Sequence, residues 1–369
     1  IPEFIYLELV GPYGPDTLRK LGKIEKYYHI YEHGTRFEVD DSGDYVPAVL
    51  PSKQIKKLIR REAQFLFGKT PEIRVSCPGE TKTENGKPNE SAMQASLNAV
   101  FTENHWSDRL IKGARDCFIG GRVALKVNTV NDTIKAVFVP ADGFVYETAI
   151  DDVDTIERIV FFYTLQDDAD RARQRIWVQK YWMEKDRCMV SERVTDGYGK
   201  TVEKDKYPPK ERQDTGLKRI PAYVIINDGL SGDTEGVSEI EDLMQDDSWY
   251  GRLKSGNIDS LRGGMNQITW MSGVDPECSK TFSRKPGALW DIKSDVTQAN
   301  AESNAATVQV DTISNDFAYA SAFNDTLANI KQDMHDLAGV PDLNLESTKS
   351  IITSGKGLKA LYWPLICRC

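Results

Sequence analysis

Two stretches in the second half of the chain carry apolar residues at helical spacing. Downstream of Ser238, apolar residues recur every three or four positions as far as Gly263 and Gly264. The second stretch carries an apolar stripe of the same period, which consists of Tyr319, Phe323, Leu327, Ile330, Met334 and Leu337. Residues at this spacing share one face of a helix. The pattern therefore predicts two long helices, over residues 236–263 and 312–338.

Capping signals mark the ends of these predicted helices. Ser238 followed by Glu241 is a capping box, in which the two side chains satisfy the first amide groups of a helix. Gly339 and Pro341 predict a helix end, because glycine adopts the left-handed conformation easily and proline cannot continue a helix. Between the two helices lie polar linkers and two predicted short strands, KPGALWDIK at 285–293 and ATVQVDT at 306–312. The arrangement predicts a small head carried on a stalk of two helices.

The chain ahead of residue 236 changes its period near Gly120. Helical spacing comes first and predicts helices over residues 15–33, 53–69, 90–103 and 106–118. Alternation of apolar and polar residues follows and predicts strands over residues 123–127, 134–138, 158–165, 174–182, 188–194, 198–202 and 220–227. Asn131 and Asp132, between the first two strands, are a hairpin turn signal. Helices followed by an antiparallel sheet indicate an α+β fold.

The composition is that of a folded protein with an acidic balance. The 369 residues are 40% hydrophobic and 28% charged, enough for two or three units with cores of their own. The net charge of −9 argues against conventional nucleic-acid binding through a basic field, but it is compatible with a surface past which DNA slides. A basic run from Lys53 to Arg61 could face phosphate or lipid, although such a run more often forms a solvated helix face.

Metal and redox chemistry find little support in the sequence. The six cysteines are widely spaced without a CxxC pair and the four histidines are scattered, which disfavours structural zinc. The CxC of Cys367 and Cys369 and a loose calcium-loop pattern at Asp228–Gly236 are weak alternatives, and no cofactor is expected. The sequence contains neither a membrane-length apolar run nor a signal peptide. Both ends of the sequence suggest that the chain is incomplete.

Four segments resemble the portal proteins of tailed bacteriophages, above all the branch found in long-tailed phages of Gram-positive bacteria. They are Asp108 to Asn128, Phe144 to Tyr163, Ile220 to Gln245 and Gly339 to Leu365. The resemblance implies an α+β portal fold with an α/β wing, a two-helix stem, a small strand-bearing clip and a tunnel loop. It assigns residues 1–235 to the wing, 236–263 and 312–338 to the stem, 264–311 to the clip, 339–353 to the tunnel loop and 354–369 to the start of a long wing helix.

The chain departs from the family pattern at its end. The family continues through the long wing helix into a helical crown, and no crown can be assigned to a chain that stops at Cys369. Pro364 falls where that long helix should continue, so that a kink or a helix end is expected there.

The resemblance also implies a function, a location and partners. Portal proteins form a ring, usually of twelve copies, at one vertex of the capsid, and they are not enzymes. The ring is expected to conduct double-stranded DNA during packaging, retention and ejection, and to dock the terminase large subunit and then the head–tail adaptor. Major capsid and scaffolding proteins are further expected partners. The expected location is the virion, after assembly in the host cytoplasm.

Two sets of site residues follow from the resemblance. In the tunnel loop, the residues expected to face DNA are Glu346, Ser347, Thr348, Lys349 and Ser350. Their hydroxyl groups can contact phosphate oxygens without reading the base sequence. In the clip, the aromatic residues expected to dock partners are Trp270, Phe282 and Trp290. These three side chains could equally fill the small core of the clip itself.

Two other classes of function remain as alternatives. A nucleotide-handling enzyme could use the run TSGKGLK from Thr353, but this run lacks the GxxxxGKS or GxxxxGKT spacing that cradles a triphosphate. No G-x-S-x-G or HExxH motif is present either. The second alternative is an oligomeric scaffold or head–tail connector component that has no DNA channel. In a monomeric or dimeric scaffold, the two long helices would form an ordinary core.

Overall fold

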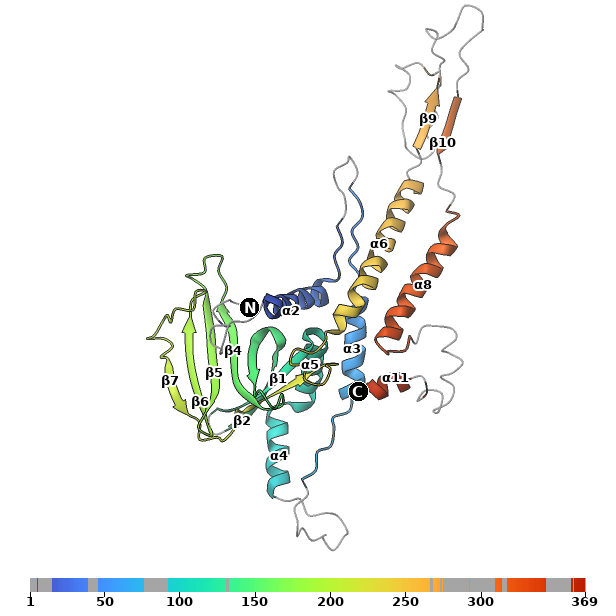
Figure 1. The fold of residues 1–369 in the computed structure, drawn as a ribbon. Helices are drawn as coiled ribbons and strands as arrows, with labels where there is room; N and C mark the ends of the chain where they lie inside the picture. Colours follow the sequence, from blue (N-terminus) through green and yellow to red (C-terminus); the bar gives the residue numbers. More distant parts are fainter. Residues whose placement is uncertain are drawn as a thin grey trace, which may run out of the picture. The chain divides into compact units, whose positions relative to one another are not determined.

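The computed structural model describes residues 5, 15–38, 46–75, 92–130, 133–265, 268–272, 274, 292, 309–313, 317–342, 360 and 362–368. The chain divides into two compact units. The first unit comprises Ile1–Arg36, Pro51–Ser248 and Lys331–Cys369, and the second comprises Phe37–Leu50 and Trp249–Ile330. Two long helices, α6 (Glu239–Met265) and α8 (Ala320–Leu337), contribute residues to both units (Figure 1).

The helices of the first unit are α2 (Pro15–His33), α3 (Gln54–Phe67), α4 (Ala92–Glu103), α5 (Trp106–Gly120) and the short α11 (Trp363–Arg368). All of these except α4 share one apolar core with residues of α6 and α8, whereas α4 contacts α5 and β2. The buried residues of the core are Tyr27, Ile30, Ile55, Leu58, Ile59, Ile119, Ile240, Leu243, Met334, Ala338, Val340 and Leu365. In α3 the buried positions recur every three or four residues, so the apolar period decides which face packs. Full burial of each large aliphatic side chain contributes roughly 1.5–3 kcal/mol.

The strands of the first unit form two antiparallel sheets, which confirms the predicted α+β class (Figure 1). The three-stranded sheet has the order β2-β1-β8 and contains β1 (Arg122–Val130), β2 (Thr133–Pro140) and β8 (Ala222–Ile226). The five-stranded sheet has the order β3-β4-β5-β6-β7 and contains β3 (Phe144–Thr148), β4 (Ile156–Gln166), β5 (Arg175–Glu184), β6 (Arg187–Thr195) and β7 (Lys210–Asp214). The short η1 (Ala141–Gly143) leads from β2 to β3. The predicted turn at 131–132 lies outside the described residues, but Val130 pairs with Thr133 on either side of it.

Two parts of the strand prediction are wrong. Residues 198–200 belong to a turn, in which the backbone amides of Tyr198 and Lys200 donate to the Asp196 carboxylate at 3.0 and 2.9 Å, and Thr201 forms an isolated bridge to Thr195 instead of the predicted strand. The sequence predicts no strand at β7, yet this segment pairs with β6. All five side chains of β7 are exposed, so no apolar alternation marks the strand and only backbone pairing defines it.

The five-stranded sheet contributes side chains to two separate cores. One core joins it to the three-stranded sheet and contains Ala124, Phe144, Ile159, Phe161, Tyr181, Cys188 and Ile220. The other core contains Ile5, Val145, Val160, Phe162, Ile176 and Val178. Because successive residues of a strand point to opposite faces, the neighbours Phe161 and Phe162 belong to different cores.

In the second unit, the segment 46–50 lies along α6. The Ala48 amide donates to the Asp259 carboxylate at 3.0 Å, and the Leu50 amide donates to Ser255 Oγ at 2.9 Å. These partners are 211 and 205 residues apart in sequence, so no local pattern could reveal the contact.

The second unit also contains the small sheet expected between the long helices. β9 (Ile268–Ser272) pairs antiparallel with β10 (Gln309–Ile313), which overlaps the predicted strand ATVQVDT. Tyr319 O–H donates to Asn257 Oδ1 at 3.2 Å and so joins α8 to α6. Gly264, near the end of α6, lies so close to Phe317 that a β-carbon there would overlap the ring. The predicted strand at 285–293 lies outside the described residues apart from Ile292.

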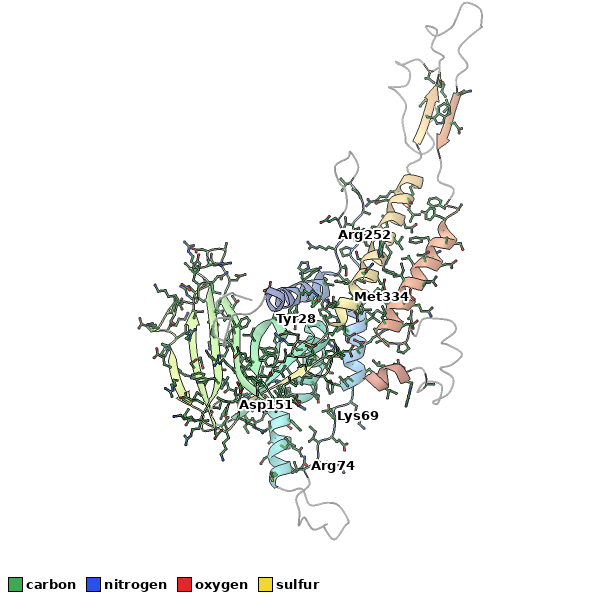
Figure 2. All side chains as sticks on the ribbon, in the orientation of Figure 1. Tyr28, Lys69, Arg74, Asp151, Arg252 and Met334 are labelled. Atoms are coloured by element: carbon green, nitrogen blue, oxygen red, sulfur yellow. The ribbon has the colours of Figure 1, made fainter. Side chains whose placement is uncertain are left out.

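α8, on which Figure 2 labels Met334, presents the predicted apolar stripe with two differences. Its less exposed positions are Tyr319, Phe323, Leu327, Ile330 and the fully buried Met334. Leu337 is 56% exposed, and the buried Ala338 takes its place in the core. The helix begins at Ala320, later than predicted, because Phe317 has a φ of 51°, which is incompatible with a right-handed helix.

Candidate functional site

The end of α8 forms a turn that precedes residues 343–359, which lie outside the described part of the chain. Gly339 has a φ of 67°, the left-handed conformation that a glycine after a helix adopts at little cost. The Val340 amide donates to the His335 carbonyl at 3.0 Å, which satisfies a carbonyl of the last helical turn. The predicted helix stop is therefore confirmed.

Lys331, His335 and Asp342 form a polar cluster across this turn, the α8 anchor. The Lys331 ammonium pairs with the Asp342 carboxylate, whose side chain is 4% exposed. His335 Nδ1 lies 2.8 Å from the Val340 carbonyl and must donate to it, since a carbonyl oxygen can only accept. His335 Nε2 lies 3.9 Å from Asp342 Oδ2. The α8 anchor therefore fixes the position of Asp342, which is the last described residue before position 343.

Two cations of α3 add positive charge around the α8 anchor. Burial, and then the nearby Arg61 and Lys331, lower the pKa of Lys57, while Asp342 acts in the opposite direction. Burial also lowers the pKa of the His335 imidazole, and the charges of Lys331 and Arg61 act in the same direction. The charge of Asp342 therefore opposes the repulsion that Lys331 and Arg61 exert on Lys57 and His335.

The basic run of α3 is only partly the solvated face that the sequence favours. Arg60 is exposed, but Lys56 lies 5.1 Å from the centre of the Tyr31 ring, and Lys57 and Arg61 are half-buried. A cation over an aromatic face is stabilised by the charge distribution of the ring. Only the tertiary contacts distinguish these roles, because the sequence shows merely a run of five basic residues, Lys53, Lys56, Lys57, Arg60 and Arg61.

The structure places one of the eight predicted site residues. Trp270 lies on β9 opposite Asp311 of β10 and is 40% exposed, so it is available at the surface of this small sheet. The other clip residues, Phe282 and Trp290, lie outside the described residues. The same holds for the tunnel-loop residues Glu346, Ser347, Thr348, Lys349 and Ser350. Both sets therefore stay predictions.

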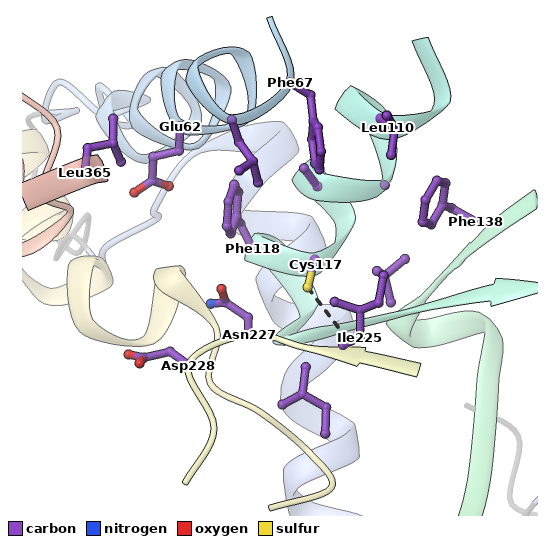
Figure 3. Close-up of a pocket in the computed structure, with 15 residues that line it drawn as sticks. Glu62, Phe67, Leu110, Cys117, Phe118, Phe138, Ile225, Asn227, Asp228 and Leu365 are labelled. Carbon is purple, nitrogen blue, oxygen red and sulfur yellow. Dashed lines mark hydrogen bonds between the residues drawn. The ribbon is translucent and has the colours of Figure 1, made fainter. Parts of the chain in front are cut away.

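A cavity of about 300 Å³ lies between α3, α5 and β8 (Figure 3). Apolar side chains such as Phe118, Phe138 and Leu365 line most of it. Its one thiol, Cys117, is buried, and its Sγ lies 3.8 Å from the Ile225 carbonyl. Burial raises the pKa of Cys117 to about 12, so the thiolate that a nucleophilic cysteine needs is scarce at neutral pH. This cavity is therefore an apolar pocket. Its cysteine is not an activated nucleophile.

A search of the described ranges for a metal site and for a membrane span gave negative results. They contain no group of three or more His, Cys, Asp or Glu side chains placed to hold a metal ion. Within the same ranges, no helix combines the length and the apolar character that crossing a membrane requires.

The described elements define a protein in which an α+β unit is joined through two long helices to a small two-stranded sheet. The family model of phage portal proteins of the SPP1 Gp6-like type matches residues 15–369, and the chain belongs to this family. Members of the family are structural proteins that assemble as rings at the capsid vertex of phages. The search of curated proteins found no match to this chain.

Proposed function

We propose that the protein forms the ring channel of a phage portal vertex, through which double-stranded DNA is packaged, retained and ejected. The observation that carries this proposal is the pair of long helices, α6 and α8, within a chain that matches the portal family over residues 15–369. The 27 residues of α6 correspond to a rod of about 40 Å at 1.5 Å per residue. A rod of this length can form the wall of a channel when copies are arranged in a ring.

A ring of twelve such helices leaves room for a DNA duplex. Helices that are each roughly 10 Å across have their axes on a circle about 38 Å wide when twelve stand side by side. Subtraction of one helix thickness leaves a bore of about 28 Å, which admits a duplex roughly 20 Å wide. A ring of twelve copies is thus wide enough for the double-stranded DNA that it is proposed to conduct.

The charge of α8 also suits a wall past which DNA moves. The helix carries three exposed carboxylates, those of Asp325, Asp333 and Asp336. Its one lysine, Lys331, forms an ion pair with Asp342. Each lysine–phosphate contact releases counterions and strengthens adhesion to DNA. A helix whose one lysine is already paired, and whose carboxylates are exposed, adheres weakly to a polyanion.

The division of the chain follows from the same proposal. Residues 1–235 form the wing, 236–263 and 312–338 the stem, 264–311 the clip, 339–353 the tunnel loop and 354–369 the start of a wing helix. The clip docks the terminase large subunit and then the head–tail adaptor, while capsid and scaffolding proteins surround the ring. The exposed Trp270 on β9 supports a docking role for the clip, because exposed aromatic side chains commonly anchor interfaces.

The tunnel loop is the proposed DNA contact, with Glu346, Ser347, Thr348, Lys349 and Ser350 facing the duplex. In support of this role, the α8 anchor holds Asp342, at the start of the tunnel loop and four positions before Glu346. The test is a packaging assay on rings that carry both Lys349→Glu and Ser347→Ala. We expect rings of normal size that package or retain less DNA. Rings that handle genomes like the parent would exclude this loop as the DNA contact, and an intact ring that never admits DNA would favour a scaffold without a channel.

A further inference from the structure

Lys126 is a buried lysine whose ammonium group has no carboxylate partner among the described residues. It lies on β1, faces the five-stranded sheet and is 8% exposed. Its hydrogen-bond partner is the neutral Oε1 of Gln179. The ring centres of Phe161, Trp177 and Tyr181 lie 4.7, 4.8 and 6.0 Å from its Nζ.

The nearest acid is already committed to other groups. Glu192 accepts from Trp177 Nε1 at 3.1 Å and from Gln179 Nε2 at 3.2 Å. It also lies 3.5 Å from the Lys210 ammonium. Gln179 therefore stands between Lys126 and Glu192, which attracts the ammonium from a distance but does not pair with it.

Keeping a cation in this position is costly, and packing does not require it. A buried charge without a direct counter-charge loses more hydration than it regains from neutral partners. Burial accordingly lowers the pKa of Lys126 to about 8, although Glu192 opposes the shift. An unbranched apolar side chain could fill the same space between the aromatic rings. The contribution of Lys126 to the stability of the fold therefore does not explain why a lysine occupies this position.

Lys126 borders a cavity of about 620 Å³ between the two sheets. The cavity is mainly apolar, with walls that include Val137, Phe161 and Trp177. Lys135 adds a second cation to the lining, and Asp142 is its one acid. Burial raises the pKa of the Asp142 carboxyl, which favours its neutral form. The charge of the cavity thus suits a ligand that brings a carboxylate.

The apolar surface continues outward from this cavity. Val137 and Tyr163, which line it, are 42% and 53% exposed, and the centre of the Tyr163 ring lies 4.9 Å from that of Trp177. A small molecule would occupy the cavity alone, whereas a peptide chain would also cover this exposed surface. The extended apolar surface therefore favours a peptide as occupant.

We propose that this cavity is a docking site for an acidic peptide segment of another protein, whose carboxylate pairs with Lys126 while an adjacent apolar side chain packs against Phe161 and Trp177. The site lies within the first unit, and its occupation does not depend on whether the ring conducts DNA. Recognition of a buried carboxylate also makes the site selective, because the uncharged amide analogue leaves the cation unpaired.

Two blocked pentapeptides test the proposal, one with the sequence Ala-Phe-Glu-Phe-Ala and one with glutamine in place of glutamate. Calorimetry on the full chain should show that the glutamate peptide binds at least tenfold more tightly, a difference of about 1.4 kcal/mol. Lys126→Met should abolish this preference, since methionine keeps an unbranched stem without charge. Lys180→Met on β5, whose ammonium lies 6.0 Å from the Trp182 ring, is the matched control and should retain the preference.

A second measurement is independent of any variant. Acetylation of Lys126 at pH 8, followed by mass spectrometry, should slow when the glutamate peptide is bound, because an ion pair raises the pKa of the ammonium group. Lys180 should be acetylated at the same rate with and without peptide. Absence of binding at millimolar peptide, equal binding of both peptides, or a preference that survives Lys126→Met would each overturn the proposal.

Discussion

Lys331 and Asp342 form an ion pair that closes the turn after α8, with the lysine side chain 23% exposed and the carboxylate 4% exposed. The pair spans the glycine stop of the helix and brings together residues 11 positions apart. It is also the last described contact before residues 343–359. The end of α8 is therefore fixed by charge as well as by apolar packing.

Replacement of Asp342 by asparagine should destabilise the first unit. The variant leaves Lys331 without its paired carboxylate and removes a negative charge close to Lys57, and we expect a loss of about 2 kcal/mol in the free energy of unfolding, less than for a fully buried pair. Urea unfolding followed by circular dichroism measures this. Asp336→Asn, an exposed change on the same helix, should alter the free energy by less than about 0.5 kcal/mol. Equal effects of the two variants would show that the ion pair is not stabilising.

Stability should fall as the pH rises from about 4 to about 6, because of Asp116. Burial raises the pKa of this carboxyl from 3.8 to about 6. The folded state therefore holds the proton more tightly than the unfolded state, so the stabilisation is complete below pH 4 and is lost as the pH rises through 6. Asp116→Asn should reduce this slope, to which Asp142 also contributes, and should keep an acceptor for the Tyr28 hydroxyl.

The control lies on the same helix. Asp108 is exposed and pairs with Lys112, and this hydrogen bond lowers its pKa, so Asp108→Asn should leave the slope between pH 4 and 6 in place. Unfolding curves recorded at several pH values test both variants. A slope of unchanged size in Asp116→Asn would contradict the assignment.

Adjacent glycines near the end of α6 should respond in opposite directions to alanine. A β-carbon at Gly263 meets no heavy atom within 4 Å, so Gly263→Ala should raise the free energy of unfolding by about 0.5–1 kcal/mol through helix propensity. A β-carbon at Gly264 overlaps the Phe317 ring, so Gly264→Ala should lower it by roughly 1–3 kcal/mol. Thermal unfolding of the two variants measures the difference, and a stabilising Gly264→Ala would show that α6 and Phe317 are not in contact.

Loss of the Trp270 side chain should weaken docking of the terminase large subunit and leave ring assembly unchanged. Trp270 is exposed on β9, and truncation of an aromatic interface anchor typically costs at least 2 kcal/mol of binding. Trp249→Ala on α6, also an exposed tryptophan of the second unit, is the matched control. Co-sedimentation of the terminase large subunit with purified rings compares docking by the Trp270→Ala and Trp249→Ala variants. Wild-type docking by Trp270→Ala rings would assign this side chain to the clip core.

Apolar periodicity was sufficient to locate the helices and most strands of this protein. The stripe of α8 and the buried face of α3 each follow from local spacing, because a side chain's direction is set by its own secondary structure. The capping serine also behaves as predicted, since Ser238 Oγ accepts from the Ile240 amide at 3.1 Å. Glu241, the other residue of the predicted capping box, accepts from Lys23 and Tyr27 of α2.

The failures of prediction share one physical cause. β7 is a strand because β6 offers it backbone partners, and its charged side chains carry no trace of that pairing. The segment 46–50 belongs with α6 through hydrogen bonds to Ser255 and Asp259, both more than 200 positions away. In each case the contact depends on backbone groups, which are the same in every residue type.

Sequence by itself determined the α+β class, the two long helices and the resemblance to portal proteins, since each rests on local spacing or on motifs. Tertiary structure alone decided which of many lysines are buried. Lys126 alternates in β1 with apolar neighbours as a solvent-facing residue would, yet a second sheet covers that face, and Lys331 meets Asp342 only because a turn folds back on its helix. The free energy of a charged side chain depends on the groups that surround it in space. Its neighbours in the sequence do not determine those groups.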